Sequence, residues 1–122
     1  MSNVDQRLED MDQVGFDKQI LTLSIPSVDI FPVEIGETLA SVVNDEIAQI
    51  VSDHPDRFLG FATLPFLDSE RTLRELERSI DTLNFRGACI GSNINGMNLD
   101  DQRLYPFYER MNDYDLPIHI HP

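Results

Sequence analysis

The sequence predicts an α/β protein in which about four parallel strands alternate with four helices. Apolar runs of strand length recur between segments whose apolar residues have helical spacing. Strands that alternate with helices in this way are joined by right-handed crossovers, and this makes them parallel. The runs are apolar on both faces, as a helix-covered sheet requires. The 122 residues suffice for a small doubly wound sheet, but a closed eight-stranded barrel takes about 250 residues.

The first half of the chain predicts a helix, a strand, a loop and a second helix. Val4, Leu8 and Met11 form one helical stripe that ends before Gly15, where a C-cap glycine fits. The next segments are an apolar strand over 19–25, an apolar loop over 27–36 and the strongest helix over 37–53. Because the loop is so apolar, we expect it to fold against another surface.

The second half predicts two further helices and three further strands. Asp68 is the expected N-cap of the third helix, and Pro106 fits the first turn of the fourth. Cys89 lies in an apolar run and is expected to be buried. The expected strands cover 58–64, 86–90 and 118–121, and a polar loop covers 91–96.

The composition excludes several classes of partner. The net charge is −13, which argues against nucleic acid, because phosphate binding needs a basic surface. No stretch approaches the roughly 20 apolar residues of a membrane span, so no membrane partner is expected. The single cysteine excludes an internal disulfide and favours a cytoplasmic location.

Two histidines lie on one face of the last expected strand. Because side chains alternate along a strand, His119 and His121 point to one side and Ile118 and Ile120 to the other. Paired imidazoles at a strand's end can hold a metal ion. The alternative is two ordinary strand histidines, since His-x-His alone is an incomplete ligand set.

Seven short segments, in their order along the chain, resemble a known family. They lie at 7–12 with 15–17, 19–21, 44–46, 54–58 with 60–65, 86–87, 90–96, and 116–117 with 120–122. No single segment is specific, but their common order is, and together they extend over nearly the whole chain. The chain resembles the amidohydrolase-related family that contains aminocarboxymuconate semialdehyde decarboxylase and the resorcylate-type decarboxylases.

The resemblance implies part of a metal-dependent (β/α)8 TIM barrel. The chain would supply strands two to five with the helix before them, as a single partial domain over 1–122 that lacks the first strand and the C-terminal strands. The implied activity of the full-length protein is that of a metal-dependent hydrolase or decarboxylase. Its implied substrate is a small aromatic or unsaturated carboxylate, and its implied cofactor is a divalent metal, zinc or manganese.

Only one metal ligand of the family has a match, and it is His121, at the fifth-strand position. His119 replaces a residue that is normally apolar in the family. It is expected to lie one layer deeper in the barrel, buried and not bound to metal. The resemblance matches no catalytic residue.

The loops after the strands form the active site in such barrels. This places Ser24, Pro65 with Phe66, Asn93, Asn95 and His121 at one rim. Asn93 and Asn95 are the candidates for binding a substrate carboxylate or hydroxyl. The alternative is that they shape the turn, since asparagine favours turns by bonding its own backbone.

The incomplete ligand set also permits a second function, that of a non-catalytic relative acting as an interaction module. On the expected fold, the first and last strands each lack a neighbour. Open strand edges are templates for pairing with another chain. We therefore expect the chain to form a homo-oligomer.

Overall fold

The structure, a computed structural model, describes residues 4–23 and 30–122. Its helices are α1 (Val4–Val14), α2 (Val33–Asp53), α3 (Ser69–Glu77) and α4 (Tyr105–Tyr114), with a π-helical turn, η2 (Arg78–Thr82), and a 3-10 turn, η3 (Gln102–Leu104). Its strands are β1 (Gln19–Leu21), β2 (Phe58–Gly60), β3 (Ala88–Gly91), β4 (Asn93–Ile94), β5 (Met97–Asn98) and β6 (Ile118–His121).

Four of these strands are parallel and follow one another in chain order. β1 pairs with β2, so that Ile20 lies beside Leu59, and β3 pairs with β6, so that Cys89 lies beside His119. A single parallel bridge between Ala62 and the first residue of β3 joins the two pairs. The predicted set of parallel strands is therefore confirmed.

Three expected boundaries were wrong. The first strand ends at Leu21, and residues 24–29 lie outside the described part of the chain. The second helix begins at Val33, because Pro32 has the extended backbone of a residue that precedes a helix, so part of the expected loop is helical. The expected loop over 91–96 contains the antiparallel hairpin of β4 and β5, with Asn95 and Gly96 at its turn.

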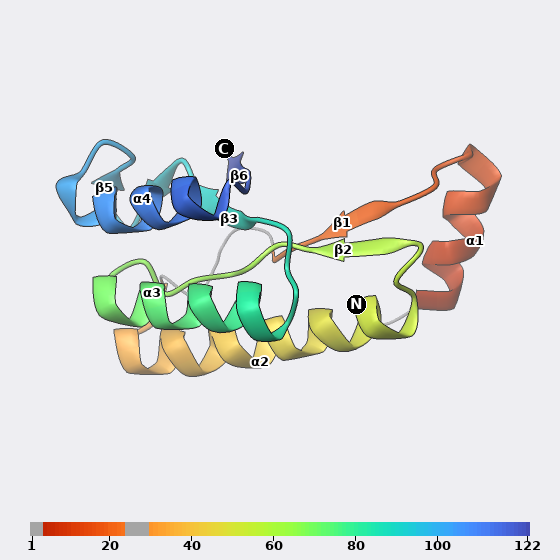
Figure 1. Ribbon diagram of the computed structural model, residues 1–122, viewed down its shortest axis with the longest axis horizontal. Coiled ribbons are helices and arrows are strands. Elements are labelled where there is room, and N and C mark those ends of the chain that lie inside the picture. The colour runs from red at the N-terminus through yellow and green to blue at the C-terminus, as the bar shows by residue number, and fades with distance from the viewer. Residues whose placement is uncertain (1–3, 24–29) are drawn as a thin grey trace.

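The helices cover one face of the strands. Figure 1 shows α2 and α3 side by side beneath the strands, and α1 at the far end of β1 and β2. Arg57 fixes that end, because its guanidinium donates to Asp12 Oδ1 at 2.8 Å and to the carbonyls of Asp17 and Phe16. Asp68 caps α3 as predicted, accepting from Arg71 N–H at 2.9 Å.

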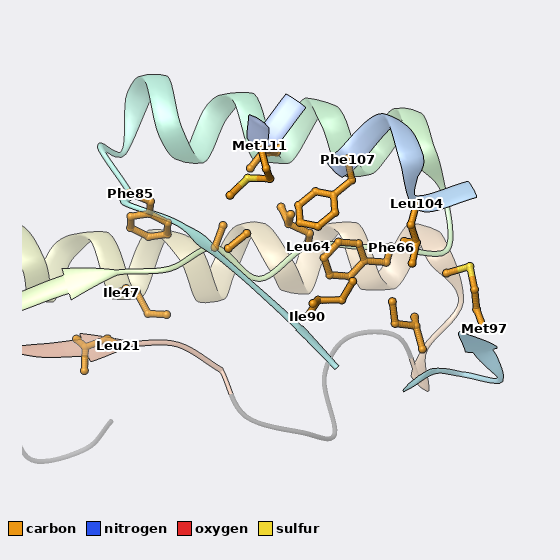
Figure 2. Packing of buried hydrophobic residues seen from close by; sticks show 14 of the residues in the cluster. Leu21, Ile47, Leu64, Phe66, Phe85, Ile90, Met97, Leu104, Phe107 and Met111 are labelled. Atoms are coloured by element: carbon orange, nitrogen blue, oxygen red, sulfur yellow. The ribbon is translucent and has the colours of Figure 1, made fainter. Parts of the chain in front are cut away.

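A single apolar core lies between the helices and the strands (Figure 2). Phe58, Phe85 and Phe107 are at most 2% exposed, and each fully buried side chain of this size contributes roughly 1.5–3 kcal/mol to stability. The T-shaped pair of Phe66 and Phe107, with ring centroids 4.9 Å apart, links the segment after β2 to α4.

The other face of the strands turns away from the helices. We call it the inner face, and it consists of Ile20, Leu59, Phe61, Thr63, Cys89, His119 and His121, which alternate with the core residues along their strands. Phe61 and Cys89 are buried but lie outside the helix-side core cluster. Part of this face is uncovered: Ile20 is 53% exposed and His119 is exposed, whereas Phe61, Thr63 and Cys89 are buried.

The apolar residues before and within the start of α2 do not pack as expected. Ile30 is 63% exposed, Phe31 41% and Ile35 50%, so the expectation that this segment folds against another surface was wrong for the part that is described. No helix within residues 4–23 and 30–122 is long and apolar enough to cross a membrane.

Candidate active site at the carboxyl ends of the strands

The carboxyl ends of the parallel strands meet at one edge of the sheet. The β4–β5 hairpin follows β3 there, and β6 ends there with His121. The backbone N–H of Ser92 donates to the carbonyl of His121 at 2.9 Å and ties the two together. Phe66 belongs to the buried core, so it does not face this edge as expected. Ser24 lies outside the described residues.

His121 is half-buried at the end of β6, with one ring nitrogen already occupied. Its Nδ1 lies 3.1 Å from the carbonyl oxygen of Pro122. In the tautomer that carries the proton on Nδ1, this nitrogen can donate to that oxygen, and the lone pair of Nε2 is then available. Metal-binding histidines commonly use one nitrogen for a backbone carbonyl and the other for the metal. His121 therefore has the arrangement of a metal ligand.

His119 lies on the same face as His121, but the two rings do not converge. Their centroids are 6.4 Å apart with an interplanar angle of 74°. Two residues along a strand span about 6.6 Å, so the rings project side by side at strand spacing. The family resemblance gives the ligand position to His121 and none to His119, so His121 is the candidate ligand of this pair.

The expectation that His119 is buried was wrong, since it is exposed. β6 is the last strand of the sheet, and no segment of the described chain covers its inner face. The expectation about Cys89 is confirmed, because Cys89 is only 9% exposed and lies next to His119 across the β3–β6 pair.

Asn93 and Asn95 build the hairpin turn. Asn93 Oδ1 accepts from Gly96 N–H at 2.8 Å, and Asn93 Nδ2 donates to Asn98 Oδ1 at 3.2 Å. Asn95 has φ +50°, in the left-handed region that asparagine tolerates. The turn-forming alternative is confirmed, and a contact of either side chain with substrate stays a prediction.

The described residues supply only part of a metal site. Residues 4–23 and 30–122 contain no group of three or more His, Cys, Asp or Glu side chains that could hold an ion. Catalytic metal sites usually take three protein ligands and leave one position open. The orientation of His121 fits one of these ligands, so the rest of the set would have to come from outside the described residues.

Sequence reasoning missed a buried polar contact that shapes this edge. The side chain of Asn44, fully buried on α2, donates from Nδ2 to the Thr63 carbonyl at 2.8 Å and accepts at Oδ1 from Thr63 N–H at 2.9 Å. Nδ2 also donates to Glu75 Oε2 at 2.9 Å. The signal in the sequence was the position of Asn44 within the apolar stripe of α2, four residues after Ala40 and three before Ile47.

The carboxylate of Glu75 is held by Arg78 in turn. Arg78 donates from Nε to Oε1 at 2.9 Å and from Nη2 to Oε2 at 2.8 Å, and this bidentate contact raises the pKa of Arg78 above its ordinary value. The second hydrogen-bonding partner of the guanidinium is Asp45, at 2.7 Å. The Asn44 side chain is therefore held by the Glu75 carboxylate, which is in turn held by its ion pair with Arg78.

Comparison with known proteins places the chain in a family. The Amidohydrolase family profile matches residues 2–122. The 2-amino-3-carboxymuconate-6-semialdehyde decarboxylase of Dictyostelium discoideum is 37% identical over 120 residues, which cover 97% of this chain and 33% of that protein. The gamma-resorcylate decarboxylase of Polaromonas sp. strain JS666 is 35% identical over 130 residues, covering 97% of this chain and 38% of that protein.

A solved structure shares the fold over the whole chain. It is the 5-carboxyvanillate decarboxylase of Novosphingobium aromaticivorans, complexed with manganese and 4-hydroxy-3-methoxy-5-nitrobenzoic acid, with a TM-score of 0.94 and 35% identity. The match covers 100% of this chain and 35% of that one, so the chain spans about a third of the length of these relatives. The prediction of part of a (β/α)8 barrel is confirmed, and the chain belongs to the Amidohydrolase family.

Proposed function

We propose that this chain is part of a metal-dependent decarboxylase that acts on a small aromatic or unsaturated carboxylate. It would form one partial domain over 1–122, with the first strand and the C-terminal strands supplied by further polypeptide. The observation that carries the proposal is the position of His121, at the carboxyl end of β6 on the inner face.

The metal would be held by His121 together with ligands from outside the described residues. Imidazole suits several divalent metals, including zinc, and manganese is bound in the 5-carboxyvanillate decarboxylase structure. When bound, such an ion supplies Lewis acidity toward the carboxylate or an activated water. The contact between His121 Nδ1 and the Pro122 carbonyl would keep the ring oriented for this role.

Decarboxylation is favoured over hydrolysis by the relatives. The Dictyostelium and Polaromonas proteins and the Novosphingobium structure all carry decarboxylase names. Their names also support an aromatic or unsaturated carboxylate as the substrate class. Asn93 and Asn95, on the hairpin that is tied to His121 through Ser92, are the candidates for a substrate contact.

The test uses the full-length protein loaded with Mn²⁺ and measures carbon dioxide release from gamma-resorcylate, 5-carboxyvanillate and related acids. We expect activity with at least one of them, and at least a thousandfold loss in His121→Ala. His54→Ala is the matched control, because His54 lies at the C-terminal end of α2 and packs edge-on against Phe58, away from the rim.

Two results would contradict the proposal. Full activity of His121→Ala would remove His121 from the metal site. Failure of the Mn²⁺-loaded parent protein to decarboxylate any of these acids would favour the non-catalytic interaction module instead.

A further inference from the structure

A row of three polar side chains crosses the inner face one layer below His121. Ala88 and Ile118 lie side by side on β3 and β6, and an isolated bridge places Ala62, in the segment after β2, beside Ala88. The residues that follow them are Thr63, Cys89 and His119. Side-chain alternation along β3 and β6 directs Cys89 and His119 to the inner face, and the parallel bridge at Ala62 continues the alternation to Thr63 at the same level. The row therefore combines a hydroxyl, a thiol and an imidazole.

The hydroxyl of Thr63 has no hydrogen-bond partner in the part of the chain that the structure describes. Thr63 is 3% exposed, and its Oγ1 finds no hydrogen bond anywhere in residues 4–23 and 30–122. A buried hydroxyl without a partner is destabilising, so it calls for an explanation. The backbone of Thr63 is not loose, because both its N–H and its carbonyl are bound by Asn44. The backbone of Thr63 is thus fixed, while its hydroxyl has no hydrogen-bond partner among residues 4–23 and 30–122.

His119, at the other end of the row, also makes no hydrogen bond within the described chain, and its only ring contact is with His121. Cys89, between them, is a free thiol. Neutral imidazole and hydroxyl groups can each donate and accept, whereas the inner face carries no lysine or arginine. Such a row suits a neutral hydroxyl better than a carboxylate, which would call for a cationic partner.

We propose that Thr63, Cys89 and His119 form the floor of the site and bind a hydroxyl substituent of the substrate. This inference rests on the function proposed above. His119 precedes His121 by two residues, or about 6.6 Å along the strand, a depth comparable with the width of a substituted aromatic ring. A ligand held at the rim could then place a ring hydroxyl against the row. Thr63 and His119 would set specificity, with Cys89 as a weaker donor.

The test compares hydroxylated and plain ligands in the full-length, Mn²⁺-loaded protein. Inhibition constants are measured for benzoate and for its 2-, 3- and 4-hydroxy derivatives. We expect at least one hydroxybenzoate to bind more tightly than benzoate in the parent protein. Thr63→Val should reduce the ratio of the benzoate inhibition constant to that of the hydroxybenzoate by about tenfold, the effect of one lost hydrogen bond. Thr63→Ser should leave this ratio unchanged. His119→Leu should reduce it as well, and benzoate binding should stay unchanged in all three variants.

Thermal unfolding distinguishes a hydroxyl that binds substrate from one that stabilises the fold. Replacing the second kind by valine should lower the Tm, whereas replacing the first kind should not. Thr72 is the matched control, because it is also 3% exposed but its Oγ1 donates to the carbonyls of Pro65 and Asp68 at 3.0 and 2.7 Å. Thr72→Val should lower the Tm. Thr63→Val should leave the Tm unchanged or raise it by a few degrees, because it removes a buried polar group that has no partner.

Three outcomes would overturn the inference. One is a Tm of Thr63→Val that falls as far as that of Thr72→Val, because the hydroxyl would then have a structural partner. Another is a parent protein that is active, with Thr63→Val and His119→Leu variants that still bind hydroxybenzoate more tightly than benzoate by the same factor as the parent. An inactive parent that binds none of the ligands would remove the proposed function and this inference together, and is thereby distinguishable from the other two.

Discussion

The carboxamide of Asn44 satisfies both backbone polar groups of Thr63, much as a neighbouring strand would. Asn44 Oδ1 accepts from Thr63 N–H at 2.9 Å and Asn44 Nδ2 donates to the Thr63 carbonyl at 2.8 Å. β1 ends at Leu21 and pairs only as far as Gly60 of β2, so the chain after β2 is held here by a helix side chain. The position of Thr63, one layer below the rim, therefore depends on α2.

Replacing Asn44 by alanine should destabilise the protein by about 3 kcal/mol. The Thr63 N–H and carbonyl would both lose their partner, and each buried polar group left unpaired costs roughly 1–3 kcal/mol. Urea denaturation of the full-length protein checks this. Gln49→Ala, which removes an exposed hydrogen bond to Asp53 on the same helix, should change stability by less than about 0.5 kcal/mol. Equal effects of the two substitutions would contradict the role given to Asn44.

Gly87→Ala should be destabilising because there is no room for a methyl group. A Cβ at Gly87 would lie 2.7 Å from the Phe61 ring and 2.8 Å from the Pro117 carbonyl oxygen. Overpacking of this kind costs about 1–3 kcal/mol. Adding Phe61→Leu should restore only part of the loss, because the Pro117 oxygen belongs to the backbone. Chemical denaturation of the single and double variants measures both effects, and a neutral Gly87→Ala would show that the strands can separate locally.

Tyr108 should make stability depend on pH in the alkaline range. Burial, and secondarily the nearby Asp100, raises the pKa of Tyr108, whose hydroxyl donates to the Leu99 carbonyl at 2.6 Å. A raised folded-state pKa means that the stabilisation is complete below the unfolded value, near 10, and is lost as pH rises through the folded value. Tyr108→Phe should cost about 1 kcal/mol at pH 7 and flatten the decline above pH 10. Denaturation curves across pH 7–11 test this, and an equally steep decline in the variant would contradict it.

The isolated chain should self-associate. Within the described residues, β1 and β6 each lack a neighbour on one side, and Ile120 of β6 is 52% exposed. The net charge of −13 opposes association, but salt screens charges beyond about 8–10 Å. Sedimentation at moderate salt should reveal oligomers that Ile120→Lys weakens, because charge protects an open edge. Val42→Lys, at a site that is 56% exposed on α2, should have little effect. A monodisperse parent chain would contradict the prediction.

As an isolated chain, the protein should also bind Zn²⁺ weakly and turn over no aromatic carboxylate. One imidazole is too few for a catalytic site, which takes three or more protein ligands. Calorimetry with Zn²⁺ is the measurement. Tight, stoichiometric binding that His121→Ala abolished would show that the ligands present here are sufficient. The same loss with His119→Ala alone would move the assigned ligand from His121 to His119.

Periodicity in the sequence predicted the strands and helices well where burial is continuous. The alternation of Ile118 to His121 correctly predicted a strand with both histidines on one face. The hairpin after β3 was missed, although Asn95-Gly96 is a strong hairpin signal, because each of its strands is only two residues long. The start of α2 was placed too late, because an apolar segment beside a proline fits a loop as well as a first helical turn.

The polar contacts of the site could not be read from the sequence. Asn44 and Thr63 are 19 residues apart, and nothing in their local pattern says that one binds the backbone of the other. The exposure of His119 depends on chain that would cover the inner face of β6, and no such segment lies in the described residues. Long-range partners of this kind follow from the packed fold, whereas periodicity reports only which face a residue occupies.

The construction of the β4–β5 hairpin also makes it a natural place to attach a reporter. Its base is bonded to β6 through Ser92 and His121, while Asn95 and Gly96 at the tip are exposed, and a Cβ on Gly96 would meet nothing within 4 Å. Asn95→Cys, with Cys89 buried, could carry a fluorophore with little labelling elsewhere in the described chain, although cysteine fits the left-handed backbone at this position less well than asparagine does. The dye would lie on the hairpin whose base is hydrogen-bonded to His121. A change in its emission would then report the binding of metal or ligand, and no turnover would be needed.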